Sequence, residues 1–505
     1  MTEVMPQIDC VVMLMLENRS LDTVLGWLHE GNDQVFVVPG NTEPTFNGIK
    51  PGMVNRTRSG MLTRAYSAEH GTQDCPQPLR VPRADPWELM PDVQRQMYGD
   101  ENEPPPVLGW GDDAPMSGFA ASYWASWDQA GEVMGAYTRE QLPVLYGLAE
   151  GFAVSDAWFS SVPTATDPNR AFSICGTSLG ATGDVLPLHF DAPTIFNGLD
   201  EAGVDWGIYW QYNGWLNLDI TPWDRVCWTV DRFPRIKQSL ASGNGRVGHY
   251  DEFFRHLHDG TLPKFSYIEP FWGWGLGLAD GDDFIGLQGN DYHPPTWVGP
   301  AESALNELYE ALKKSRQWKH MLFIITFDEN GGTWDHVSPP KVRAPDDNPS
   351  DNPSFDFTRL GPRVPTLLVS RYVVPGTVFR APEGASVPFD HTSVIKTILA
   401  WAGTSQEFID SMGHRVHDAP LFDHALSDEP HPHNRPTFTV PPGYPDQGGP
   451  KGPHGWPFDI DYLPWDVLRA LMRELEADPS LGPTRLREAL VERVRQLQAH
   501  REDAG

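Results

Sequence analysis

Residues 321–332 read MLFIITFDENGG, a run of seven residues that is apolar except for Thr326 and is followed by two acids, an asparagine and two glycines. An almost continuous apolar run predicts a strand buried on both faces, as in a parallel sheet. The residues before it, 301–315, read AESALNELYEALKKS and place Leu305, Leu308, Tyr309 and Leu312 on one side of a helix. A helix therefore leads into a buried strand.

The same pattern recurs on either side of this stretch. Residues 8–16 form a second, almost continuous apolar run, and residues 364–370 (VPTLLVS) predict a third strand. Residues 392–401 (TSVIKTILAW) predict a helix that begins after Asp390 and His391. Helices that alternate with buried strands predict an α/β fold with a central, mostly parallel sheet, and ligands of such sheets bind at the carboxyl ends of the strands.

Acidic residues follow two of these strands directly. Glu17 and Asn18 follow the first, and Asp328 and Glu329 follow the strand at 321–327. Clustered carboxylates repel one another unless a cation joins them, so the two pairs indicate a divalent metal with oxygen ligands. The alternative for the first pair is an ordinary strand-to-helix turn, with Ser20 or Asp22 as the helix cap.

The segment VPTATDPNRAF places a threonine before a helix start. Thr166 could be a plain N-cap of a helix whose first turn contains Pro168, Asn169 and Arg170. The other interpretation is an anion site made by the helix N-terminus and Arg170, which would hold the Thr166 hydroxyl beside a bound phosphate.

Among the 17 histidines, His293 in NDYHPP and His336 in WDHVSPP lie in loops stiffened by proline. A rigid loop suits a positioned acid or base, although a structural turn with a hydrogen-bonded histidine has the same sequence. We expect His391 in FDHTS to support the start of a helix.

With these residues identified, the chain resembles the phosphoesterase family that contains bacterial phosphatidylcholine phospholipases C, plant non-specific phospholipases C and a bacterial acid phosphatase. The motifs that carry the resemblance are ENRSLD (17–22), TDPNR (166–170), NDYHPP (290–295), DENGGTWDHVSPP (328–340) and FDHTS (389–393). Their order and their placement at strand ends agree with one active site. The match spans roughly residues 8 to 405 and implies an alkaline-phosphatase-like α/β sandwich with helices on both faces of the sheet.

The resemblance also implies residue roles. It makes Thr166 the nucleophile and makes Glu17, Asn18, Asp328 and Glu329 the ligands of one divalent metal ion, Ca²⁺, Mg²⁺ or Mn²⁺. We expect His293, or His336 in its place, to act as the acid and base, and we expect Asn18, Asn169 and Arg170 to contact the phosphoryl group. Relatives often have a histidine where this chain has Glu88, so Glu88 is expected at the substrate.

The amino-acid composition limits which molecules the protein can bind. The 38 basic and 68 acidic residues give a formal charge of −30, which repels nucleic acid and anionic bilayers. A zwitterionic lipid or a small phosphate ester remains compatible, with at most transient membrane contact. The four cysteines, at 10, 75, 175 and 227, are far apart and predict buried thiols. The N-terminus lacks the features of a signal peptide, which predicts a cytoplasmic protein.

Three segments are expected. Residues 1–427 form the catalytic domain, with long insertions at 32–118, 205–250 and 271–300 that wall the site. Residues 428–456, rich in proline, histidine and glycine, form a linker, and residues 457–505 form a C-terminal helical appendage. The expected activity is phospholipase C cleavage of phosphatidylcholine-like diesters. The alternatives are an acid phosphatase of soluble monoesters and an inactive homologue that binds metal or phosphate.

Overall fold

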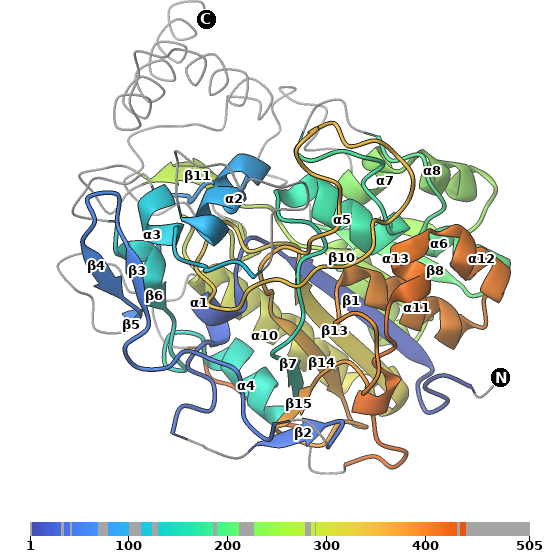
Figure 1. Ribbon diagram of the computed structural model, residues 1–505. Helices are drawn as coiled ribbons and strands as arrows, with labels where there is room; N and C mark the ends of the chain where they lie inside the picture. Colours follow the sequence, from blue (N-terminus) through green and yellow to red (C-terminus); the bar gives the residue numbers. More distant parts are fainter. Residues whose placement is uncertain are drawn as a thin grey trace, which may run out of the picture.

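A computed structural model describes most of the catalytic region (Figure 1). The described residues are 3–31, 35–40, 43–68, 79–99, 113–123, 130–184, 189–211, 227–277, 284–287, 289–431 and 435–440. Most of the expected linker and the whole expected C-terminal helical segment lie outside these residues, and so does Cys75. Cys10, Cys175 and Cys227 are buried free thiols, as predicted.

A nine-stranded sheet forms the centre of the molecule, in the order β2-β15-β7-β14-β13-β1-β10-β8-β9. The strand bounds, in that order, are Phe36–Val38, Thr377–Phe379, Ala153–Ser155, Thr366–Ser370, Met321–Phe327, Cys10–Leu16, Phe265–Glu269, Trp206–Trp210 and Arg246–His249. Strand β14 runs antiparallel to both of its neighbours, and every other pairing in this sheet is parallel. The predicted α/β fold with a mostly parallel sheet is confirmed.

Burial of the central strands explains why helices cover the sheet. All seven residues of β1 and all seven of β13 are buried. Successive side chains of a strand point to opposite faces, so both faces must be covered. Helices α5, α6 and α11 pack together (Figure 1), and α10 packs against α4 and, through fewer contacts, against α9.

The helix bounds are α1 Leu21–Leu25, α2 Met90–Tyr98, α3 Phe119–Ser122, α4 Pro143–Gly151, α5 Thr166–Cys175, α6 Ile195–Glu201, α7 Trp228–Arg232, α8 Pro234–Ala241, α9 Tyr250–Asp259, α10 Gly299–Lys314, α11 His391–Ala402, α12 Gln406–Ser411 and α13 His414–Asp418. The predicted apolar face of α10 is buried, and α11 begins at His391 with Asp390 as its N-cap. No helix in the described part of the chain is long and apolar enough to cross a bilayer.

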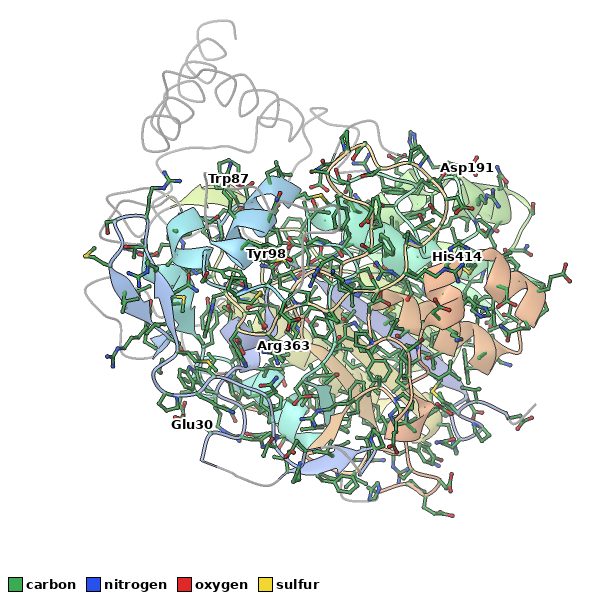
Figure 2. All side chains as sticks on the ribbon, viewed as in Figure 1. Glu30, Trp87, Tyr98, Asp191, Arg363 and His414 are labelled. Atoms are coloured by element: carbon green, nitrogen blue, oxygen red, sulfur yellow. The ribbon has the colours of Figure 1, made fainter. Side chains whose placement is uncertain are left out.

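Short ribbons lie outside the main sheet: β3 Val54–Arg56 with β4 Leu62–Arg64, β5 Tyr66–Ser67 with β6 Gly135–Ala136, and β11 Trp274–Gly277 with β12 Phe284–Leu287. Two expectations about the insertions are wrong. Residues 32–118 and 205–250 were expected to be insertions around the site, but the first contains β2 of the central sheet and the second contains β8 and β9. Side chains fill the interior, where Arg363 is buried, whereas Asp191 lies at the periphery (Figure 2).

The register of β1 and β13 places the active-site candidates at one edge. Leu16 is paired with Phe327, so the next residues of the two strands, Glu17 and Asp328, emerge at the same level. Both strands are parallel and adjacent, and their carboxyl ends therefore meet at this edge of the sheet.

Candidate active site

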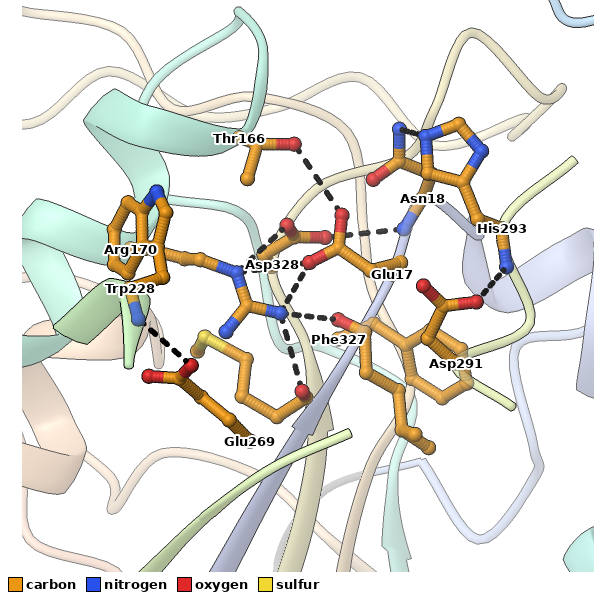
Figure 3. A network of polar contacts seen from close by, with 12 residues as sticks. Glu17, Asn18, Thr166, Arg170, Trp228, Glu269, Asp291, His293, Phe327 and Asp328 are labelled. Carbon is orange, nitrogen blue, oxygen red and sulfur yellow. Dashed lines mark hydrogen bonds and ion pairs between the residues drawn. The ribbon is translucent and has the colours of Figure 1, made fainter. Parts of the chain in front are cut away.

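A buried guanidinium joins the two predicted carboxylate pairs (Figure 3). Arg170 donates through Nε to Glu17 Oε1 at 2.8 Å and to Asp328 Oδ2 at 3.3 Å. Its other nitrogens donate to Tyr267 Oη at 3.3 Å and to the Met15 carbonyl at 3.1 Å. The guanidinium therefore orients the carboxylates of Glu17 and Asp328. The N–H groups in these contacts donate to protein atoms and not to a substrate.

Thr166 is the first residue of α5, and Ala165 is the N-cap. The interpretation of Thr166 as a plain N-cap is therefore wrong, because its hydroxyl is not used to satisfy the helix terminus. The Thr166 hydroxyl instead donates to Glu17 Oε2 at 3.3 Å (Figure 3). This geometry places a half-buried hydroxyl directly above the carboxylate cluster.

Asn169 supports the turn that carries Thr166. Its amide donates to the carbonyls of Val162, Thr164 and Ala165 at 2.7–3.2 Å, and its Oδ1 accepts from the Val162 N–H at 3.1 Å. These bonds fix the backbone before α5. The structure does not turn the Asn169 side chain toward Glu17 and Asp328.

Asn18 links the two halves of the site. Its backbone has φ +54°, a left-handed conformation that asparagine tolerates better than most residues. Its N–H donates to Asp328 Oδ1 at 3.0 Å, and its Nδ2 donates to Glu88 Oε2 at 3.0 Å and to His293 Nε2 at 2.9 Å. Gly331 lies against this residue, where a Cβ would collide with the Asn18 carbonyl oxygen.

The tautomer of neutral His293 follows from its partners. The Pro294 carbonyl can only accept, so Nδ1 of His293 carries the proton that it donates there. Its Nε2 then has the free lone pair that accepts from Asn18. Asp291 fixes the loop, since its Oδ1 accepts from the His293 N–H at 3.1 Å and its carbonyl accepts from the Glu17 N–H at 2.8 Å.

The electrostatics of the cluster favour a bound cation. Burial raises the pKa of Glu17, against the opposing effect of Arg170, and burial together with Glu88 and Asp328 raises the pKa of Glu329 well above its usual range. Among the described residues, Asn18 Oδ1 and Glu329 Oε1 are buried oxygens that no donor reaches. Carboxylate and amide oxygens are the ligands of Ca²⁺, Mg²⁺ and Mn²⁺, so the residues present fit such an ion.

His336 lies in a different cluster. It donates through its backbone N–H to Asp22 Oδ2 at 2.8 Å, and its Nδ1 lies 2.6 Å from the same oxygen. Arg363 bonds Asp22 Oδ1 and Asp335 Oδ1, each at 3.0 Å. The structure therefore brings His293 to Glu17 and Asn18, and it places His336 beside this buried arginine instead.

Some residues near the site have contacts that the sequence did not predict. Ser20 caps α1, accepting from the Thr23 N–H, as the alternative interpretation of that segment proposed, yet Glu17 still belongs to the cluster. His391 begins α11 as predicted, and its Nε2 also donates to the Asp328 carbonyl at 2.6 Å. Asp291 lies within the quoted motif NDYHPP, and Asp85 begins the segment that ends at Glu88, but neither acid was assigned a role from the sequence.

Comparisons with known proteins show the family of this chain. A model of the phosphoesterase family matches residues 8–403. The chain is 32% identical over 429 residues to non-specific phospholipase C4 of Arabidopsis thaliana, covering 80% of this chain and 72% of that protein. It is 30% identical over 292 residues to phospholipase C B of Mycobacterium tuberculosis, covering 54% of this chain and 52% of that protein.

Solved structures are more distant. A protein in the alkaline phosphatase superfamily from Vibrio parahaemolyticus aligns with a TM-score of 0.32 and 12% identity, over 55% of this chain and 64% of that chain. The family match covers most of the present chain, and the plant relative is aligned over more than two thirds of both lengths. The resemblance in the motifs is thus confirmed, and the chain belongs to the phosphoesterase family.

Proposed function

We propose that the protein is a metal-dependent phospholipase C that hydrolyses phosphatidylcholine-like phosphodiesters through a phosphothreonine intermediate. Membership of the phosphoesterase family establishes the coarser part, a hydrolase of phosphoester bonds. The substrate, the metal and the nucleophile are the proposed parts. The proposal depends on one observation: the Thr166 hydroxyl does not cap α5 and instead donates a hydrogen bond to Glu17.

Glu17, Asn18 Oδ1, Asp328 and Glu329 would hold the divalent cation. When bound, it would supply positive charge that lowers the pKa of a nearby hydroxyl and stabilises phosphoryl oxygens. Arg170 keeps Glu17 and Asp328 in place through the bonds described above. The hydrogen bond from Thr166 to Glu17 aims the hydroxyl proton at a carboxylate, which leaves the oxygen lone pairs for attack.

In the proposed reaction, the Thr166 hydroxyl passes its proton to Glu17 Oε2 while Oγ1 attacks phosphorus and the bond from phosphorus to the diacylglycerol oxygen breaks. His293, protonated at Nε2, would give that proton to the leaving alcohol, and the neutral ring would then take a proton from the attacking water. Water displaces the threonine oxygen, which takes its proton back from Glu17, so that phosphocholine is released and Thr166 is restored. The buried loop that positions His293 through Asp291 suits this role.

A second candidate is phosphatase activity on soluble monoesters, because the same nucleophile and cation serve either ester. The test compares hydrolysis of a phosphocholine diester and a phosphate monoester that release the same chromophore, using metal-loaded protein. Faster diester cleavage supports the phospholipase C proposal, and monoester preference would replace it with phosphatase. No turnover of either ester would favour an inactive homologue.

Two variants of one residue separate chemistry from folding. Thr166→Ala should remove turnover and leave metal content unchanged within a factor of about two. Thr166→Ser keeps the hydroxyl and should retain measurable turnover. Full activity of Thr166→Ala would contradict the proposed nucleophile.

A further inference from the structure

The hairpin made by β3 and β4, residues 54–64, exposes apolar side chains. Val54, Met61 and Leu62 are 44%, 58% and 61% exposed. They are three of the six large apolar side chains that are exposed in the described part of the chain. Single exposed apolar residues are common on protein surfaces, whereas several on one short element indicate a surface that contacts a partner.

One face of the hairpin packs on the protein. Asn55 is buried, its Nδ2 donates to the Met116 carbonyl at 2.9 Å, and its Oδ1 accepts from the Ala120 N–H of α3 at 3.1 Å. Successive side chains of a strand point to opposite faces, so the residues on either side of Asn55 and of its partner Thr63 point away from α3. These outward residues, all exposed, are Val54, Arg56, Leu62 and Arg64.

Apolar and basic side chains alternate on this outer face. Val54 is paired with Arg64, and Arg56 is paired with Leu62. Val54 and Leu62 are therefore diagonal neighbours, at the spacing of about 7–8 Å that such positions have in antiparallel strands. At a bilayer surface, apolar side chains enter the acyl region while guanidinium groups bond the lipid phosphates. The outer face of the hairpin has both kinds of side chain.

The charge of this segment is opposite to that of the chain. Residues 44–68 contain Lys50, Arg56, Arg58 and Arg64 and no acid, although the formal charge of the protein is −30. With 68 acids in 505 residues, a stretch of this length would contain about three on average. A locally basic surface complements the phosphate groups of lipid head groups, and the remaining acidic surface does not.

The hairpin is attached to the two segments that lead away from the candidate active site. Strand β3 packs on α3, and α3 packs on α2, which begins two residues after Glu88. The Ile49 N–H, just before the hairpin, donates to the carbonyl of Gly26, the C-cap of α1, at 2.8 Å. Helix α1 itself begins three residues after Asn18. Figure 1 shows β3 and β4 at the margin of the molecule, beside α3.

We propose that the 54–64 hairpin docks the protein on the surface of a phosphatidylcholine bilayer, with its apolar side chains among the acyl chains and its arginines on the phosphates. The inference rests on the proposed function, in which the substrate is a phospholipid. A second copy of this chain fits the hairpin less well. A stable protein interface takes about 20–30 residues a side, and a symmetric dimer would bring the same basic surface against itself.

The experiment measures sedimentation of the full chain with sucrose-loaded vesicles of palmitoyl-oleoyl phosphatidylcholine, in EDTA so that metal-dependent hydrolysis does not consume them. We expect the wild type to bind. Met61→Ser and Leu62→Ser together should weaken binding about tenfold or more, and Arg64→Gln should weaken it about threefold. The control is Phe36→Ser, in which a side chain that is 51% exposed lies outside the hairpin, and it should bind like the wild type.

A wild type that stays in the supernatant would overturn the proposal, and so would wild-type binding by either hairpin variant. Wild-type dimers seen by light scattering without vesicle binding would assign the hairpin to a second copy instead. The substituted side chains are exposed, and circular dichroism checks the fold. If the double variant does not fold, Val54→Ser takes its place, with an expected loss of about threefold.

Hydrolysis of soluble p-nitrophenyl phosphocholine by metal-loaded protein separates this proposal from the proposed function. The hairpin variants should match the wild type on that soluble ester. Cleavage of the ester without vesicle binding would refute the docking surface alone. Vesicle binding through the hairpin without cleavage of any ester would refute the proposed activity and leave the docking surface in place.

Discussion

Removing the charge of Arg170 should destabilise the metal-free protein far more than the metal-loaded protein. Arg170 is fully buried and contacts Glu17 and Asp328, which are also buried. In Arg170→Met the side chain keeps most of its apolar length, but two carboxylates lose their cation. Breaking a buried ion pair by removing one partner costs about 3–5 kcal/mol, because the remaining charge is left uncompensated.

A cation on the same carboxylates would replace the missing charge. We therefore expect Arg170→Met to lose about 3–5 kcal/mol of unfolding free energy at pH 8 in EDTA, and less with saturating Mn²⁺. The assay is urea unfolding followed by tryptophan fluorescence, with and without metal. Burial opposes the charged form of Arg170, but Glu17, Tyr267 and Asp328 outweigh it and raise the pKa of Arg170, so the wild-type guanidinium stays charged throughout.

Arg235→Met is the matched control. Arg235 Nε bonds Asp191 Oδ1 at 2.9 Å, but the two side chains are 40% and 68% exposed. Exposed pairs contribute about 0–1 kcal/mol, so this variant should change little in either condition. A loss in Arg170→Met no larger than that of Arg235→Met would refute the assignment of Arg170 as the cation that compensates Glu17 and Asp328.

Three further outcomes are expected. Gly331→Ala should lower turnover and metal affinity at least tenfold. Gly331 has φ +55°, and the added Cβ would collide with Asn18. A metal affinity equal to that of the wild type, measured by calorimetry, would contradict this prediction. Metal binding should release protons, because the pKa of Glu329 is raised well above its usual range and a carboxyl that becomes a metal ligand must be deprotonated. Heats that are equal in buffers of different ionisation enthalpy would exclude proton release. Burial raises the pKa of Glu302 to about 7, above its usual 4.5. The protonated Glu302 side chain therefore stabilises the folded protein fully below about pH 4.5, and this stabilisation is lost as pH rises through 7. Wild type should therefore lose roughly 3 kcal/mol relative to Glu302→Gln between pH 4.5 and 8 in urea unfolding, and parallel pH profiles would argue against it.

Elements with strong patterns could be predicted from the sequence. The run at 321–327 became β13 with the same bounds, and the face of Leu305 and Leu308 became the buried side of α10. These segments are buried over their whole length or along one stripe, so periodicity reports their environment directly. Strands β8 and β9 were missed because short strands among Trp and Gly residues have no clear period.

Residues of the candidate site could be predicted from the sequence only where an acidic residue directly follows a predicted strand. Glu17 and Asp328 follow apolar runs, and their proximity follows from parallel pairing. The choice between the two interpretations of Thr166 depended on a shift of one residue at the start of α5, which propensity alone does not resolve. His336 and His293 lie in similar motifs, yet long-range contacts with Asp22 and Asn18 place them in different clusters.

The position of β1 has a consequence for synthesis of the chain. This apolar strand ends at Leu16, but its partners are β10, which begins at Phe265, and β13, which begins at Met321. About 250 residues must be made before β1 can pair, which takes roughly 12–50 s at about 5–20 residues per second. During that time a continuous apolar segment is outside the ribosome without its neighbours. The nascent protein should therefore be a client of chaperones that shield exposed strands, and slowing translation before residue 265 should increase its aggregation.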